Sequence, residues 1–229
     1  MPDVIIAAMP DAAGTPASAV PRLDRANRPG ALLWASSVQF FIAQAVAQSA
    51  WTTPFSLRWN FISDLGNTAC APYPPGSQTF VCSPWHALMN GSFLMLALTI
   101  LPGTLLLRRA FPPGALARAG LVLVALAGAG YALVGVFPEN VNLPPHKLGA
   151  AVQFVGGNLG IAMLGLAMIR ARARPGMAAW FGVSGAAGLV ATALLVSGRF
   201  LGLGIGGMER IAAYPLPVAL ILAGAAFAR

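Results

Sequence analysis

Long apolar runs alternate with short polar segments along most of this chain. Six runs approach the ~20 residues that an α-helix needs to cross a bilayer. They lie at Ala31–Trp51, Trp85–Leu107, Ala119–Phe137, Lys147–Ile169, Met177–Ser197 and Ile211–Phe227. Most of the breaks between them contain Pro–Pro or Pro–Gly pairs, which stop helices and form turns. The pattern predicts an all-α integral membrane protein with six transmembrane helices within residues 30–229.

Composition supports this class. Hydrophobic residues make up 57% of the chain and charged residues only 9%, and the mean hydropathy is +0.73. A soluble domain carries roughly 25% charged residues, so this chain cannot cover a water-facing surface. The net charge of +8 does not indicate nucleic acid, because the basic residues form short clusters between apolar runs. We interpret these clusters as topology signals, and we expect membrane lipids as partners.

The basic residues favour one orientation of the six helices. Ten of them fall on one side of the predicted membrane: Arg22, Arg25, Arg28, Arg108, Arg109, Arg118, Arg170, Arg172, Arg174 and Arg229. The other side has four: Arg58, Lys147, Arg199 and Arg210. The positive-inside rule then places both termini in the cytoplasm and predicts a multi-pass protein of the cytoplasmic membrane. Residues 1–29 lack a signal-peptide pattern and are expected to form a disordered cytoplasmic tail.

Both cysteines lie in the first predicted outside loop, residues 52–84. Eleven residues separate Cys70 from Cys82, and an oxidising compartment would allow them to pair. A zinc site made of cysteines alone is disfavoured, because the chain has no CxxC pair. We therefore predict a Cys70–Cys82 disulfide, with two unpaired thiols as the alternative.

The predicted outside face collects the chemically active side chains. The inside loops contain no acid and no histidine, whereas the outside boundary carries Arg58, Asp64, His86, Glu139, His146, Lys147, Arg199, Glu209 and Arg210. Amides continue from this face into the predicted spans, at Gln44, Gln48, Asn90 and Gln153. Polar groups in hydrocarbon must be paired or must line a wet cavity. The set predicts a polar cavity that opens outward, although each amide alone could simply bind a neighbouring helix.

Two sets of glycines have the spacing that permits close helix approach. They are Gly156 with Gly160, and Gly198 with Gly202 and Gly206. Small residues four apart let two helix backbones come together. We expect these positions to lie at helix–helix contacts.

Four stretches together resemble a known family. They are NFISDLGNTAC (60–70), CSPWHALMNGSF (82–93), GVFPENVNLPPHKLGA (135–150) and GGMERI (206–211). They are similar to the bacterial membrane proteins catalogued as domain of unknown function 998, in the variant with a Cys pair in the first outside loop that is common among actinobacterial members. The resemblance covers about residues 31–229 and implies a six-helix membrane protein, but no established activity.

Three functions are compatible with the sequence. The first is a membrane protein whose outside cavity binds or acts on an amphipathic, lipid- or isoprenoid-like ligand. Polar residues of this cavity would be Gln44, Gln48, Asn90, Gln153, Arg58 and Arg210. The second is a hydrolase or cyclase that uses acid–base catalysis or a metal. The third is a non-catalytic accessory subunit, in which the outside charges would form only salt bridges.

The second hypothesis assigns specific roles to the outside cluster. Its acid–base residues would be Asp64, Glu139 and Glu209, and a divalent cation such as zinc would be held by His86 and His146. Both the first and the second hypotheses require one geometry. They predict that Glu139 and His146 face the same cavity as Asp64 and His86, although the four residues come from different connections and helix ends.

Overall fold

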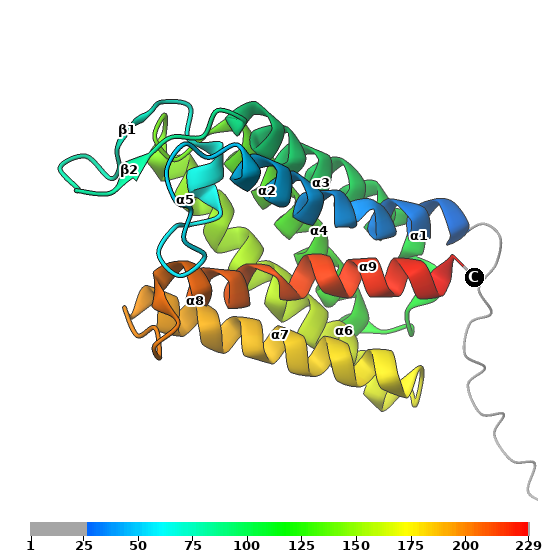
Figure 1. The fold of residues 1–229 in the computed structure, drawn as a ribbon. Helices are drawn as coiled ribbons and strands as arrows, with labels where there is room; N and C mark the ends of the chain where they lie inside the picture. The colour runs from blue at the N-terminus through cyan, green and yellow to red at the C-terminus, as the bar shows by residue number, and fades with distance from the viewer. Residues whose placement is uncertain (1–26, 229) are drawn as a thin grey trace, which may run out of the picture.

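A computed structural model describes residues 27–228. The predicted tail 1–29 lies outside the described residues, except for its last three, which begin the first helix. Within the described range, six helices are long and apolar enough to cross a membrane, and Figure 1 shows them aligned side by side as one bundle. The chain is therefore an all-α, six-span membrane protein, as the hydrophobic pattern predicts.

Several spans are composite. The first contains α1 (Arg28–Ala35), a 3-10 turn (Ser36–Val38) and α2 (Gln39–Ser49). The second is α3 (His86–Leu107), and the third is α4 (Ala115–Val136). The fourth contains α5 (Leu143–Ala151), a π-helical turn (Val152–Gly157) and α6 (Asn158–Arg170). The fifth is α7 (Pro175–Val196), and the sixth contains α8 (Gly204–Ala213) and α9 (Pro215–Phe227).

The outer surface of the bundle is apolar. Many large hydrophobic side chains are exposed on the spans, for example Leu98, Val183 and Val190. Such a surface is costly in water but matches lipid hydrocarbon. The interior instead holds an aromatic cluster in which the ring of Phe40 lies 5.7 Å from that of Phe93 and 6.1 Å from that of Tyr131. The side chains therefore separate as expected for a protein surrounded by lipid.

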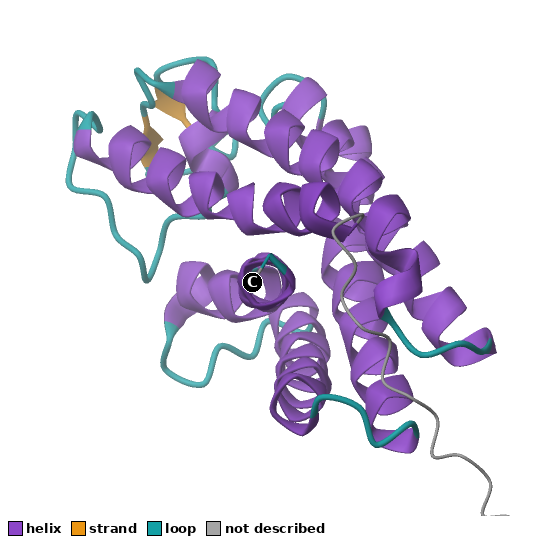
Figure 2. Ribbon diagram, turned by 90° about the vertical axis from the view of Figure 1, so that its right-hand side faces the viewer, coloured by secondary structure: helices purple, strands orange, loops and turns teal. Residues whose placement is uncertain are grey.

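The two ends of the bundle differ. Both ends of the described chain lie at one end, opposite the small hairpin of β1 (Ala71–Pro72) and β2 (Phe80–Val81), as Figure 1 shows. Figure 2 views the bundle from the end that carries the C-terminus, so that the last helix is seen end-on at the mark C. The bonded pair Cys70–Cys82 flanks the two strands of the hairpin, which confirms the predicted disulfide. We call its end the disulfide end and the opposite end, with Arg108, Arg109 and Arg170, the arginine end.

The glycine predictions hold only in part. Gly160 packs backbone to backbone against Gly120 of α4, where an added Cβ on either residue would lie 2.9 Å from the carbonyl oxygen of the other. Gly156 makes no comparably close contact. Gly198 and Gly202 are not at a helix interface; they lie in the α7–α8 connection with φ values of +70° and +80°. Glycine is favoured at these two positions because the turns there require left-handed backbone.

The sixth span starts earlier than the hydrophobic pattern predicts. Helix α8 begins at Gly204 instead of Ile211, so Glu209 and Arg210 lie inside a helix and not in a loop. A prediction from hydropathy ends a span at charged residues. Here both charged side chains find hydrogen-bond partners in other segments of the fold, so the helix includes them. The span then breaks at Tyr214, because Pro215 and Pro217 lack the N–H groups that would continue the helical ladder.

Candidate functional site

One segment of the first connecting loop folds back across the disulfide end. We call residues 56–67 the strap. Its residues Ile62, Asp64, Leu65 and Asn67 are buried, and a 3-10 turn spans Ser63–Gly66. Asp64 stabilises this turn locally, since its Oδ2 accepts hydrogen bonds from the Phe61 amide at 2.9 Å and from Asn60 Nδ2 at 3.1 Å. A polar loop is thus built into the end of the bundle.

Helix α8 holds the strap through the Glu–Arg pair. Glu209 Oε2 accepts a hydrogen bond from the Ile62 amide at 2.6 Å. Arg210 Nη1 donates to three carbonyl oxygens, those of Leu57, Asn60 and Gly206, at 3.1, 2.9 and 2.8 Å. The two charges therefore satisfy backbone groups that would otherwise be buried unpaired at high cost.

The α4–α5 connection contacts the strap from another side. Ser63 Oγ donates a hydrogen bond to Glu139 Oε2 at 2.8 Å. The Tyr73 hydroxyl, from the disulfide hairpin, donates to the Glu139 carbonyl oxygen at 3.1 Å. Next to them, Asn140 and Thr68 exchange two hydrogen bonds, one from the Thr68 amide and one to its hydroxyl oxygen. Glu139 is thus at the junction of the strap, the hairpin and the α4–α5 connection.

Helix α3 and the residues just before it complete the enclosure of the strap. Asn90 Nδ2 donates to the Gly66 carbonyl oxygen at 2.9 Å, and Ser83 Oγ donates to the Leu65 carbonyl oxygen at 2.7 Å. An added Cβ on Gly66 would collide with the Asn90 amide, so the Asn90 side chain would have to leave its present position. The four sequence stretches that carry the family resemblance therefore all meet at the strap.

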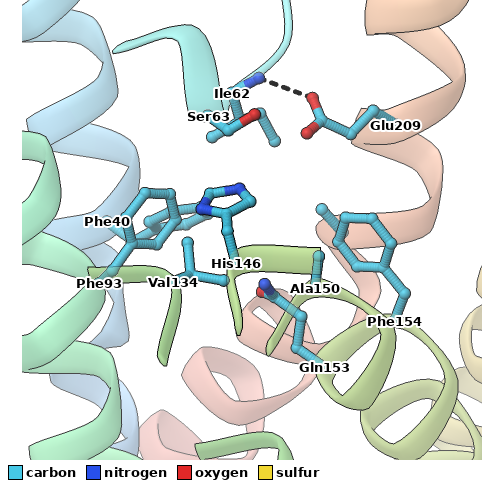
Figure 3. Close-up of a pocket in the computed structure, with 11 residues that line it drawn as sticks. Phe40, Ile62, Ser63, Phe93, Val134, His146, Ala150, Gln153, Phe154 and Glu209 are labelled. Carbon is cyan, nitrogen blue, oxygen red and sulfur yellow. Dashed lines mark hydrogen bonds between the residues drawn. The ribbon is translucent and has the colours of Figure 1, made fainter. Parts of the chain in front are cut away.

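A small cavity lies beneath the strap (Figure 3). Its volume is about 20 Å³, which is room for about one water molecule. Its polar lining comes from Ser63, His146, Gln153 and Glu209. His146 Nδ1 donates to the Phe137 carbonyl oxygen at 2.9 Å, so Nδ1 carries a hydrogen and Nε2 is the ring nitrogen left without this partner. The cavity joins side chains from the strap, the fourth span and α8.

The π-helical turn helps to form this cavity. It spans Val152–Gly157 in the middle of the fourth span and includes Gln153, which is buried and lines the cavity. A π-turn widens the helix locally and changes the direction of the side chains that follow it. Such turns are frequent at functional sites.

Three acids are buried close together at this end. Asp64, Glu139 and Glu209 are 4%, 8% and 6% exposed. Burial raises the pKa of Glu139 well above its ordinary value, and the nearby Asp64 and Glu209 carboxyls raise it further, while the Ser63 hydrogen bond opposes this shift. Burial, together with the nearby Glu139 and Asp64 carboxyls, also raises the pKa of Tyr73 to about 12. The electrostatic field at Glu139 is therefore set by the other acids of this cluster.

Other predicted site residues lie apart from the cavity. His86 Nδ1 is 2.9 Å from the Ser83 carbonyl oxygen and does not line the cavity that His146 lines. The Arg58 side chain is exposed beside the Trp59 ring, and Gln48 is half-buried. Gln44 Oε1 accepts a hydrogen bond from the Tyr214 hydroxyl at 2.8 Å, which is a helix-to-helix contact. Among residues 27–228, no three His, Cys, Asp or Glu side chains form a group able to hold a metal ion.

A larger groove opens on the lipid-facing side of α8 and α9. It has a volume of about 420 Å³ and is almost entirely apolar. Its walls are α7 on one side and the broken sixth span on the other. The lining residues are Trp180, Val183, Ser184, Ala187, Arg210, Ile211, Tyr214, Pro215 and Val218. Arg210 therefore belongs both to the strap contacts and to the groove.

Sequence reasoning missed several residues of this site. Asn60 joins Asp64 to the turn, Tyr73 binds the Glu139 backbone, and Tyr214 connects the groove to the first span. Asn60 could have been found, because it begins the first stretch of the family resemblance. Tyr73 and Tyr214 carry no local signal, since their roles depend on contacts between distant segments.

The fold and the site define a class, a six-span membrane protein whose buried acids and strap close one end of the bundle. Comparison with known families gives the particular group: the model of a protein family of unknown function, DUF998, matches residues 34–226. The chain belongs to this family. Comparisons with curated proteins and with solved structures found no match.

Proposed function

We propose that this protein binds an amphipathic, lipid-like molecule whose apolar chain occupies the groove between α7 and α8–α9. The groove is the observation that carries the proposal. Ligand pockets generally enclose 300–1,000 Å³, and about 420 Å³ of apolar space lies within that range. Its mouth faces the membrane, so a lipid chain could enter sideways from the bilayer.

The broken sixth span supports a binding role for this groove. The proline break at Tyr214 separates α8 from α9, and Tyr214, Pro215 and Val218 line the groove at and beyond the break. Membrane transporters commonly form ligand sites at discontinuous helices. Arg210 lies nearest the disulfide end, and Val218 lies eight residues further along the span, about 12 Å at 1.5 Å per residue. A polar head group would therefore sit toward the disulfide end, with the chain pointing inward.

Binding fits this site better than catalysis. The cavity with Ser63, His146 and Glu209 holds about one water molecule, so a substrate could enter only if the strap moved. Asp64 and Glu209 are already bound to backbone amides of the strap. These contacts give the acids a role in closing the bundle end, and the groove remains the space with ligand size.

We also propose that the disulfide end faces the outside of the cytoplasmic membrane. Among the described residues, seven basic side chains belong to the arginine end and four to the disulfide end, and the positive-inside rule assigns the end with more of them to the cytoplasm. Disulfides persist in oxidising compartments, which agrees with this orientation. The ligand head group would then lie in the outer leaflet.

Fluorescence quenching tests the groove directly, because Trp180 lines it. The full chain in a maltoside detergent is titrated with phosphatidylcholine that carries bromine atoms on its chains. Saturable quenching is expected, and it should be absent in Trp180→Phe, which identifies the reporter. Ala187→Phe fills the groove and should weaken binding at least about tenfold, or about 1.4 kcal/mol.

Val190→Phe is the matched control, because Val190 lies on the same helix, is 60% exposed and does not line the groove. This variant should bind like the wild type. Quenching that does not saturate would refute the proposal. So would equal binding by Ala187→Phe and Val190→Phe.

A further inference from the structure

Glu139 is too poorly solvated to be an ordinary carboxylate. Its Oε2 accepts one hydrogen bond, from Ser63, and its Oε1 is buried without a donor from any residue that the structure describes. An ionised carboxylate has about four acceptor positions to satisfy, and a buried charge without partners is very costly. The geometry indicates that Glu139 is neutral.

The acids around Glu139 explain why it holds a proton. Asp64 follows Ser63, whose hydroxyl binds Glu139 Oε2, and both carboxyls are buried. Two like charges buried so near each other are unfavourable, and one proton removes that repulsion. Asp64 Oδ2 already accepts two N–H groups, from Phe61 and Asn60, whereas Glu139 Oε1 has no donor among the described residues. The proton therefore belongs on Glu139.

We propose that Glu139 is a proton-binding site, and that its proton fastens the strap to the α4–α5 connection. The two carboxyls belong to different elements, because Asp64 is in the strap and Glu139 precedes α5. Loss of the proton would place two like charges against each other at this contact. We call this contact between the strap and the α4–α5 connection the latch, and protonation closes it. This role goes beyond the lipid-binding function proposed above.

The groups around the pair set the direction of the pH response. Glu139 is near Asp64 of the strap, Glu209 of α8 and Tyr73 of the hairpin, and His146 of α5 binds the Phe137 carbonyl next to it. The charges that act on Glu139 come from acids, and they favour its protonated form. The unfolded chain loses this proton near the ordinary pKa of 4.5, whereas the folded protein keeps it to higher pH. The stability from the latch is therefore full at acidic pH and is lost as the pH rises.

Infrared spectroscopy tests whether the proton is present. At neutral pH the full chain should show a carbonyl stretch from a protonated carboxyl group that is absent in Glu139→Gln. This band should disappear at alkaline pH, and Asp64→Asn should move its loss to lower pH, because a neighbouring negative charge has been removed. Identical spectra for the wild type and Glu139→Gln would overturn the proton-binding site.

Hydrogen exchange tests whether this proton fastens the strap. After correction for intrinsic exchange rates, protection of the strap amides should fall about tenfold between pH 6 and pH 9, because the proton that holds the strap is lost as the pH rises. Glu139→Gln keeps the Ser63 contact and should show no such fall. Asn140→Ala removes the adjacent neutral contact with Thr68, so it should lower protection equally at both pH values. A pH-dependent fall in Glu139→Gln, or none in the wild type, would overturn the latch.

Discussion

At the scale of single residues, Gly206 sets how closely helix α8 approaches the strap. Its amide donates to the Arg58 carbonyl oxygen at 2.9 Å. A Cβ at this position would lie 2.9 Å from the Leu57 carbonyl oxygen and 3.0 Å from Arg210 Nη1. Backbone atoms cannot move aside as a flexible side chain can. The glycine next to the Glu–Arg pair is therefore a requirement of the backbone contact.

We predict that Gly206→Ala destabilises the protein by about 1–3 kcal/mol, the usual cost of overpacking a tight contact. The measurement is thermal unfolding in detergent, followed by tryptophan fluorescence. Gly91→Ala on α3 is the matched control, because an added Cβ there meets no atom within 4 Å. Equal melting temperatures for the two variants would show that α8 does not depend on this close approach.

At the scale of elements, the sequence predicted the helices that are encoded by local hydrophobic runs. It missed the features that depend on contacts between distant segments. Each span is encoded by its own apolar run, so five of the six begin within a few residues of their predicted positions. The strap has no such signal, because a polar segment such as Asn60–Asn67 resembles any solvent-exposed loop. Its burial depends on partners from α3, α8 and the α4–α5 connection. The early start of α8 was missed for the same reason, since Glu209 and Arg210 find their partners across the fold.

The candidate site was predicted in part. The disulfide-end location of Asp64, Glu139, His146 and Gln153 followed from orientation and helix spacing. The sequence did not reveal that the cavity is only water-sized, or that His86 lies outside it, because volume depends on how side chains pack. The apolar groove had no polar marker in the sequence at all.

The disulfide holds the hairpin that brings Tyr73 to Glu139. Replacing both cysteines by serine, Cys70→Ser with Cys82→Ser, opens a loop that is closed across a sequence separation of 12, and should cost about 3 kcal/mol in the chain-entropy model. The lower stability should be visible as a reduced melting temperature and as faster hydrogen exchange in β1 and β2. If the double variant melts with the wild type, the hairpin does not contribute to stability in this way.

At the scale of the whole molecule, the apolar exterior, the six spans and the family match define a multi-pass membrane protein. The two bundle ends have different chemistry: arginines gather at one, and buried acids, the strap and the disulfide at the other. The groove runs along the lipid-facing side and reaches Arg210 near the disulfide end. A head group at that end and a chain in the groove would match this polarity.

The proposed orientation makes a labelling prediction. A membrane-impermeant maleimide should not label Arg172→Cys in intact cells and should label it once the membrane is permeabilised. Arg199→Cys, an exposed position at the disulfide end, is the control and should be labelled in intact cells. Labelling of Arg172→Cys from outside would reverse the assignment of the two ends.

The central claim, that the groove binds a lipid-like molecule, is tested most directly by an experimental density map of the protein purified with its native lipids. The account predicts elongated density between α7 and α8–α9, with its tail beside Trp180 and its head toward Arg210 and the disulfide end. An empty groove, or one filled by a helix of a second protein copy, would contradict the account.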